Sequence, residues 1–304
     1  MLSKLRNPSS VAAAVLVVGG GATLLADNPI TVGIALLIIA VIFGYYGAQK
    51  YQFYRHLTQN TDDAMALNNG ELANIEGRVK EAVDAPLEAP MTGDESVFAT
   101  WLIEEWNQQG ETSQWARRGA GIVSVPYTVT AQNGQSIRVS VPNQAATKEQ
   151  SYFDKTPAGD SALQSEDAVA VNRVVGALDT EKAQVTVEPD EAPPQQVQAF
   201  LNSLDNVEEG SASVRNLVDF GRQHGKRRYT IQTLGSGDKV FVHGEVDGTS
   251  TPTKIKAADP YTVVSSMSGD EYRSEVRENV RFYAALILSC VLVFLFSVAL
   301  FLLA

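Results

Sequence analysis

The chain has 304 residues, 44% of them hydrophobic, and 35 acidic against 24 basic side chains give it a formal net charge of −11. A chain with this excess of acid does not attract nucleic acid or anionic lipid over long distances, so a general nucleic-acid-binding role is excluded. Its single cysteine, Cys290, falls inside an apolar run, so neither a disulfide nor a cysteine-based zinc site can form within one chain.

Two apolar runs open the sequence, at residues 11–26 and 30–46, with only a short polar turn between them. Each run is close to the shortest length that crosses a bilayer as a helix, and a turn that ends in proline suits the start of a second helix. The pattern predicts a transmembrane helical hairpin over residues 1–48. A cleaved signal peptide is the alternative for the first run, because Lys4 and Arg6 precede it.

A third apolar run, residues 282–304, closes the sequence without a charged side chain. As a helix it is long enough to cross a hydrocarbon layer of roughly 30 Å, so it predicts a C-terminal transmembrane helix. A buried core helix of a soluble protein is the alternative, which the lack of any polar face disfavours. Residues 49–70, after the hairpin, are expected to form a membrane-proximal helical linker.

Basic residues flank the apolar runs on what would be one side of the membrane: Lys4, Arg6, Lys50, Arg55, Arg273, Arg277 and Arg281. Lysine and arginine resist transfer across a bilayer, and this bias sets the orientation of membrane proteins. We therefore expect a multi-pass protein of the plasma membrane with the N-terminus and the central region in the cytoplasm and Ala304 outside.

The central region, residues 71–270, has the pattern of a β-rich domain. Alternating apolar and polar side chains predict strands around 75–79, 97–106, 123–130, 136–141 and 184–187. Asn133 and Gly134 are typical of a tight hairpin turn, and residues 235–238 predict the turn of a second strand pair.

Two segments interrupt this pattern. Residues 143–166 are polar and predict a long loop. A helical insertion is expected at about 193–223, where two prolines open a run with apolar residues at helical spacing. The predicted fold class is α+β, with three transmembrane helices flanking a β-rich soluble domain that is an OB-like or other small barrel of about five strands.

The order of these pieces resembles the GIDE domain, which occurs in mitochondrial membrane-anchored ubiquitin ligases of the MULAN type and in archaeal and bacterial membrane proteins. The runs that resemble it are residues 75–106, 125–139, 234–246 and 259–268. The acidic residues are scattered, with few lysines among them, which is similar to the surfaces of proteins from salt-loving archaea. An archaeal, halophilic member of the family is therefore expected, with an ordinary acidic bacterial protein as the alternative.

The resemblance implies ubiquitin transfer only where a zinc-binding RING domain follows the last membrane helix. This sequence ends at Ala304, and its three separated histidines, His56, His224 and His243, cannot make such a site with the one cysteine. We expect no metal and no cofactor.

Catalytic constellations are also missing from the sequence. The adjacent carboxylates Asp94 with Glu95 and Glu104 with Glu105 are typical of solvated surface in an acidic chain. His243 is expected at the surface, on the strand face opposite to its valine neighbours. We predict no catalytic residue.

The remaining candidates are contacts with a partner. Trp101 and Trp106 lie five residues apart on one predicted strand, so they face opposite ways, and one should fill the core while the other is exposed. Lys226, Arg227 and Arg228 form the strongest basic cluster, suited to lipid headgroups or an acidic partner, with a solvated strand start as the alternative.

The sequence thus predicts a binding or scaffolding module beside the lipid bilayer, with an unidentified protein partner. Two alternatives stay open. One is an enzyme, including a ligase-related protein that works with a separate RING-bearing subunit, and the other is an accessory subunit of a transport or secretion complex.

Overall fold

The computed structural model describes residues 29–59, 68–89, 93–109, 112–147, 168–171, 174–180, 182–189, 191–204, 226–250, 252–257 and 262–303. The first predicted membrane helix, 11–26, lies outside these residues, as do most of the predicted loop and the second half of the helical insertion. The chain divides into two compact units, Met1–Arg55 with Ser274–Ala304, and His56–Arg273.

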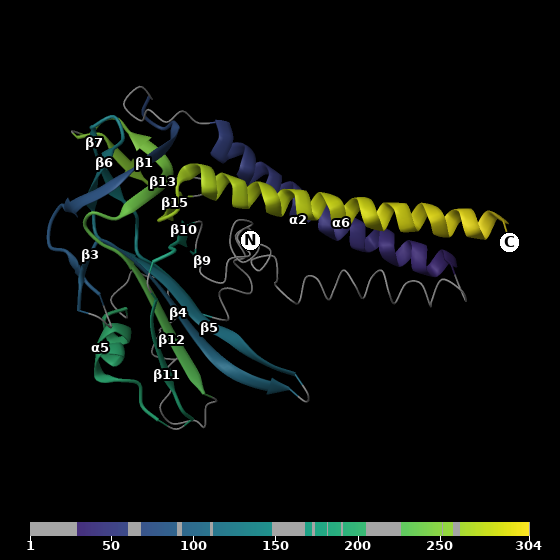
Figure 1. Cartoon of the computed structure of the whole chain (residues 1–304), viewed down its shortest axis with the longest axis horizontal. Coiled ribbons are helices and arrows are strands. Elements are labelled where there is room, and N and C mark those ends of the chain that lie inside the picture. The colour runs from purple at the N-terminus through teal and green to yellow at the C-terminus, as the bar shows by residue number, and fades with distance from the viewer. Residues whose placement is uncertain are drawn as a thin grey trace. The chain divides into compact units, whose positions relative to one another are not determined.

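The first unit contains most of two long helices, α2 (Pro29–Gln59) and α6 (Gly269–Leu303), which lie side by side in Figure 1. Among the described residues these are the two helices long and apolar enough to cross a membrane. The predicted second membrane helix and the start of the predicted linker are one continuous helix, since α2 has no break before Gln59.

Small residues bring α2 and α6 together. A Cβ added to Gly33 would lie 3.2 Å from Phe294, and one added to Gly47 would lie 3.3 Å from Tyr283, so the helices run antiparallel. Cys290 is buried among aliphatic side chains of the pair, which fits the packing role that its apolar surroundings indicate.

One basic residue counted as a membrane flank is buried between the same helices. Lys50 has no exposed surface, and its Nζ lies 5.6 Å from the centre of the Tyr283 ring. The aliphatic side chains Leu288, Leu292 and Leu295 are exposed instead. The helix pair thus has an apolar outside, as a lipid-facing surface requires.

The second unit is built around a closed five-stranded barrel. The strands in ring order are β1 (Leu72–Ala82), β6 (Tyr127–Ala131), β7 (Ser136–Ser140), β14 (Lys254–Lys256) and β13 (Lys239–Asp247), and β13 pairs again with β1. All neighbours are antiparallel except β7 and β14. Closure leaves the ring without a free edge.

The barrel interior is filled by the inward half of each alternating strand. Ile75, Val129, Val242 and Ile255 are buried there together, one from each of four strands. The β6–β7 hairpin turns at Asn133 and Gly134, as predicted, and Gly134 adopts the positive φ of 82° that such a turn requires.

Three further strands extend the barrel sheet from β13: β15 (Thr262–Ser265), β10 (Val174–Ala177) and β9 (Ala168–Val171). A separate short pair is formed by β2 (Leu87–Glu88) and β3 (Glu95–Ser96).

A second sheet has five antiparallel strands in the order β11 (Lys182–Val187), β12 (Arg227–Leu234), β4 (Phe98–Gln109), β5 (Thr112–Ser124) and β8 (Gln144–Thr147). Residues 144–147 are therefore strand, where the sequence predicted the start of a loop. The helix α5 (Gln195–Leu204) falls within the predicted insertion and packs Val197 and Phe200 on this sheet. Figure 1 shows β4, β5, β11 and β12 as long ribbons with α5 beside them.

The predicted hairpin around residues 235–238 is wrong, although its turn is present. Gly237 has φ of 88°, but β12 pairs with strands of the second sheet and β13 with strands of the barrel. The turn bonds to β1 instead, because Gly237 N donates to the Val79 carbonyl at 2.8 Å and Val79 N to the Asp238 carbonyl at 2.9 Å. The fold class is α+β with a β-rich domain that contains a five-stranded barrel.

Candidate functional site

Most of the predicted contact residues gather at one end of the second sheet. This charged end comprises Glu104, Glu105 and Trp106 of β4, Trp115 and Arg118 of β5, Lys226–Arg228 at the start of β12, and Glu188 after β11. The register places Glu104 opposite Arg228, and Trp106 opposite Trp115. A register shift in β5 skips Arg118, so the alternation along β4 continues undisturbed.

Arg228 is the centre of this cluster. Its Nε and Nη2 atoms both donate to Glu104 Oε2, at 2.7 Å and 2.6 Å, and its guanidinium carbon lies 4.5 Å from the centre of the Trp115 ring. Glu104 is only 9% exposed. A guanidinium held at once by a shielded carboxylate and an indole face is fixed in one position.

Trp106 lies on the outer side of the same stack. Its ring contacts Trp115 edge to face, with centroids 5.2 Å apart and planes at 66°. It is 37% exposed, whereas Trp101 is 2% exposed and packs against Phe200. The prediction that one tryptophan fills the core and the other is exposed is therefore confirmed.

Trp115 was missed by the sequence reasoning. The antiparallel pairing of β4 with β5 sets Gln109 opposite Thr112 and therefore Trp106 opposite Trp115, so the signal was the equal spacing of the two tryptophans from these residues. Trp101 is accommodated because Gly121 stands opposite it: a Cβ there would lie 2.4 Å from the indole ring.

The basic cluster is matched by acids from other strands. Arg228 pairs with Glu104, Lys226 Nζ lies 2.6 Å from Glu188 Oε1, and Arg118 forms an ion pair with Glu105. Arg227 is buried and lies opposite Glu105 in the register. The predictions of an open basic patch and of a solvated carboxylate at Glu104 are therefore both wrong. Neighbouring strands supply the opposite charges, and the local sequence does not reveal which strands those are.

His243 is buried, contrary to the surface position predicted for it. It is 1% exposed, and its Nδ1 lies 2.8 Å from Asn74 Oδ1, while Asn74 Nδ2 donates to the Leu57 carbonyl at 2.8 Å. Because the amide nitrogen of Asn74 is committed to Leu57, its oxygen must accept, so His243 Nδ1 carries the proton. Burial, with a smaller contribution from His56, lowers the pKa of His243 to about 4.

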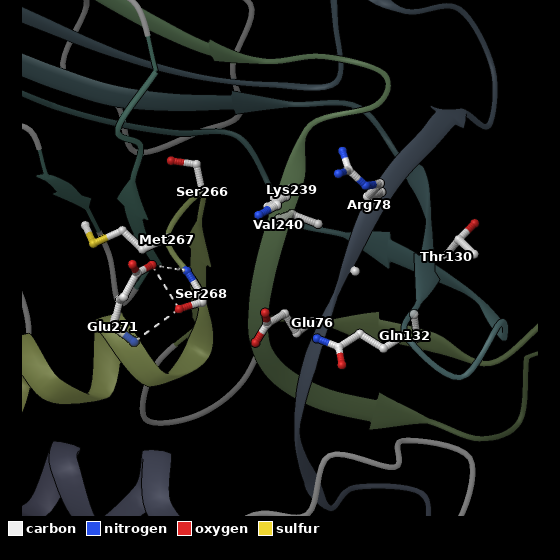
Figure 2. A pocket seen from close by; sticks show the side chains of 12 residues that line it. Glu76, Arg78, Thr130, Gln132, Lys239, Val240, Ser266, Met267, Ser268 and Glu271 are labelled. Carbon is white, nitrogen blue, oxygen red and sulfur yellow. Dashed lines mark hydrogen bonds between the residues drawn. The ribbon is translucent and has the colours of Figure 1, made fainter.

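An open pocket of about 530 Å³ lies on the outer face of the barrel, beside the first turn of α6 (Figure 2). It is lined by β1, β6 and β13 and by the segment that follows β15. Glu76 Oε2 accepts from Gly269 N at 3.1 Å, while Glu271 Oε2 accepts from Ser268 N at 3.0 Å and from its hydroxyl at 2.9 Å. The two acids of the pocket thus cap the helix.

Among the described residues, no group of three histidine, cysteine or carboxylate side chains lies close enough to hold a metal ion. Asp94 and Glu95 are exposed, as their pattern predicts. The arrangement at the charged end of the sheet is suited to binding, because its charged groups are paired with each other and its aromatic group is presented to solvent.

The fold and these surfaces define an α+β protein that joins two apolar helices to a β-rich domain. Comparison with protein-family models, with curated proteins and with solved structures gave no match to this chain. The resemblance to the GIDE domain stays a prediction from the sequence.

Proposed function

We propose that this chain is a membrane-anchored binding module that holds a protein partner beside the bilayer through the charged end of its second sheet. The observation that carries the proposal is the exposed Trp106, supported from behind by Trp115 and Arg228. Tryptophan and arginine are the residues most enriched at the energetic centres of protein interfaces. A ring that is already fixed loses little conformational freedom on binding.

The partner surface follows from the same geometry. Lys226, Arg228 and Arg118 are each paired with an acid, and Arg227 is buried, so the bases described at the charged end offer little free charge to an acidic ligand. An apolar pocket that accepts the indole of Trp106, with polar groups at its rim to meet the ion pairs, is the complement that this surface requires.

Anchoring of this module is proposed to be multi-pass in the plasma membrane, with the domain in the cytoplasm. What supports it is the apolar exterior of the α2 and α6 pair together with the basic flanks in the sequence. Protease added outside intact cells should then leave residues 56–273 uncut. Cleavage of that region in intact cells would contradict the orientation.

The GIDE family is our proposal for the domain. The support is that a five-stranded ring, which is consistent with an OB-like barrel, contains the hairpin at residues 125–139, and that the closing run at 259–268 contains β15 and leads into α6. A halophilic archaeal source fits the scattered acid and makes purification in high salt the appropriate condition.

The binding proposal is tested with the full chain, purified from its source membrane in mild detergent. Trp106→Ala should lose the co-purifying partner protein, because the anchor side chain is removed. Lys80→Ala, which removes an exposed side chain of β1 outside the charged end, is the control and should retain the partner. Equal recovery by both variants would contradict the proposal.

The identity of the partner separates the remaining functions. A conjugating enzyme or a ubiquitin-like protein lost on Trp106→Ala would place the chain in a ligase-related assembly with a separate RING subunit. Channel or secretion subunits lost in the same way would make it an accessory of a transport complex.

A further inference from the structure

Arg78 and Lys239 form a like-charged pair on the outer face of the barrel. They are directly opposite each other in the register of β1 and β13, so their side chains leave the sheet on the same face (Figure 2). Like charges in this position destabilise a sheet. Two adjacent bases without an acid between them are unexpected in a chain with net charge −11, and they do not stabilise the barrel. A ligand that carries negative charge would account for them.

The acids nearest to this pair are already engaged. Glu76 accepts from the first turn of α6, and Glu271 closes a reciprocal capping arrangement with Ser268. Within the part of the chain that the structure describes, no ion pair joins Arg78 or Lys239 to a carboxylate. Both side chains are exposed, so their charges face the solvent of the pocket.

Hydrogen-bond donors extend the row across the pocket. Thr130 of β6 lies opposite Arg78 on the other side of β1, and Gln132 follows it at the pocket edge. Arg78 is held in place, since its Nη1 donates to the Gly237 carbonyl at 2.7 Å, which leaves its other guanidinium N–H groups for a ligand.

We infer that this pocket binds a phosphate-type anion between Arg78 and Lys239, with Thr130, on the strand next to Arg78, as a hydroxyl donor. A forked guanidinium and a point-charge ammonium side by side are the pair of cations that phosphate oxygens accept best. The pocket volume of about 530 Å³ is large enough for a phosphate ester and not only for the bare ion. Both a free phosphate compound and the headgroup of a phospholipid present this chemistry.

A bound anion would relieve the repulsion between Arg78 and Lys239. A residue that binds the anion should therefore weaken binding when it is replaced without lowering the stability of the ligand-free chain, whereas a residue that only supports the fold should lower that stability. Lys239→Met should leave the ligand-free chain as thermally stable as the wild type or more so, because the like-charge pair is gone. The same change should weaken phosphate binding by about tenfold, the effect of losing one charge-assisted contact.

The test uses the full chain in neutral detergent at constant ionic strength, with chloride exchanged for the probe. Inorganic phosphate and glycerol 3-phosphate are the soluble probes, and phosphatidic acid against phosphatidylcholine in the micelles is the lipid arm. Thermal stability is measured for the wild type, Lys239→Met, Arg78→Gln and the control Lys80→Met, which removes an exposed charge from the same strand outside the pocket.

Stabilisation of the wild type and of Lys80→Met by soluble phosphate, reduced in both pocket variants, would support a site for a free anion. Stabilisation by phosphatidic acid alone, with the same dependence on Arg78 and Lys239, would support a headgroup site. If neither probe stabilises the wild type, or if the pocket variants respond as strongly as the wild type, the inference is wrong.

Discussion

The barrel and the charged end of the second sheet use the same hydrogen-bonded ladder in two ways. In the barrel, every strand has a neighbour on both sides and its inward residues, such as Ile75 and Val242, are buried. At the charged end, β4 and β5 extend beyond the apolar core. Ion pairs join the strands there: Arg228 of β12 with Glu104 of β4, and Arg118 of β5 with Glu105 of β4. Burial of apolar side chains stabilises the barrel. The charged end depends more on ion pairs and keeps Trp106 exposed for binding.

The largest loss of stability in the barrel should come from adding a side chain at Gly77, where β1 and β6 leave no room for one. A Cβ at Gly77 would lie 2.2 Å from the Thr130 carbonyl oxygen, so Gly77→Ala has to force β1 and β6 apart. We expect a loss of about 3 kcal/mol or more in the free energy of unfolding, measured by denaturant titration. Gly134→Ala, which has open space but φ of 82°, is the control and should cost about 1 kcal/mol.

Acid should weaken the barrel through His243. Its pKa is about 4 in the folded chain against an ordinary value of 6.5, so the folded state binds a proton at the imidazole less readily than the unfolded state does. The stabilisation is present above pH 6.5 and is lost as the pH falls toward 4, by about 3 kcal/mol in all. His243→Gln should flatten this part of the pH profile, and an unchanged slope would contradict the burial of the imidazole.

Removing Arg228 tests the other region. Arg228→Met leaves the shielded Glu104 without a partner and removes the cation from the Trp115 ring. We expect a loss of about 2 kcal/mol in the free energy of unfolding, less than for an entirely buried pair because both groups keep some contact with water. Adding Glu104→Gln should recover part of that loss, and a double-mutant cycle without coupling would show that the pair contributes nothing.

Trp106→Ala should have the smallest effect on folding. It removes an edge-to-face contact and a partly exposed ring, so about 1 kcal/mol or less is expected in thermal or denaturant unfolding. Trp101→Ala on the same strand empties a buried site and should cost about 3–5 kcal/mol. Equal losses for the two variants would contradict the division between core and binding surface.

The sequence predicted features that depend on neighbouring residues. The turn at Asn133 and Gly134, the different burial of Trp101 and Trp106, and most of the predicted strands follow from alternation and turn chemistry, and they are present. These signals need only a few residues of context. The single strand predicted at 123–130 is wrong, because the chain leaves β5 at Ser124 and starts β6, in the barrel, at Tyr127.

What the sequence did not predict depends on partners far along the chain. His243 alternates as a surface residue should, yet it is buried and bonded to Asn74, which in turn donates to the Leu57 carbonyl. Arg228 pairs with Glu104, which lies on a strand more than a hundred positions earlier in the chain. The turn at Gly237 sends its two strands into different sheets because β1, and not the opposite arm of the turn, supplies the hydrogen bonds.

The ring order of the barrel also has a consequence for how the chain folds during synthesis. β1, β6 and β7 leave the ribosome early, but the ring cannot close until β13 and β14, near residue 256, have joined β1 and β7. Contacts of such high sequence separation slow folding, and until then β1 and β7 each present a bare edge. The nascent domain is therefore exposed to aggregation for most of its translation.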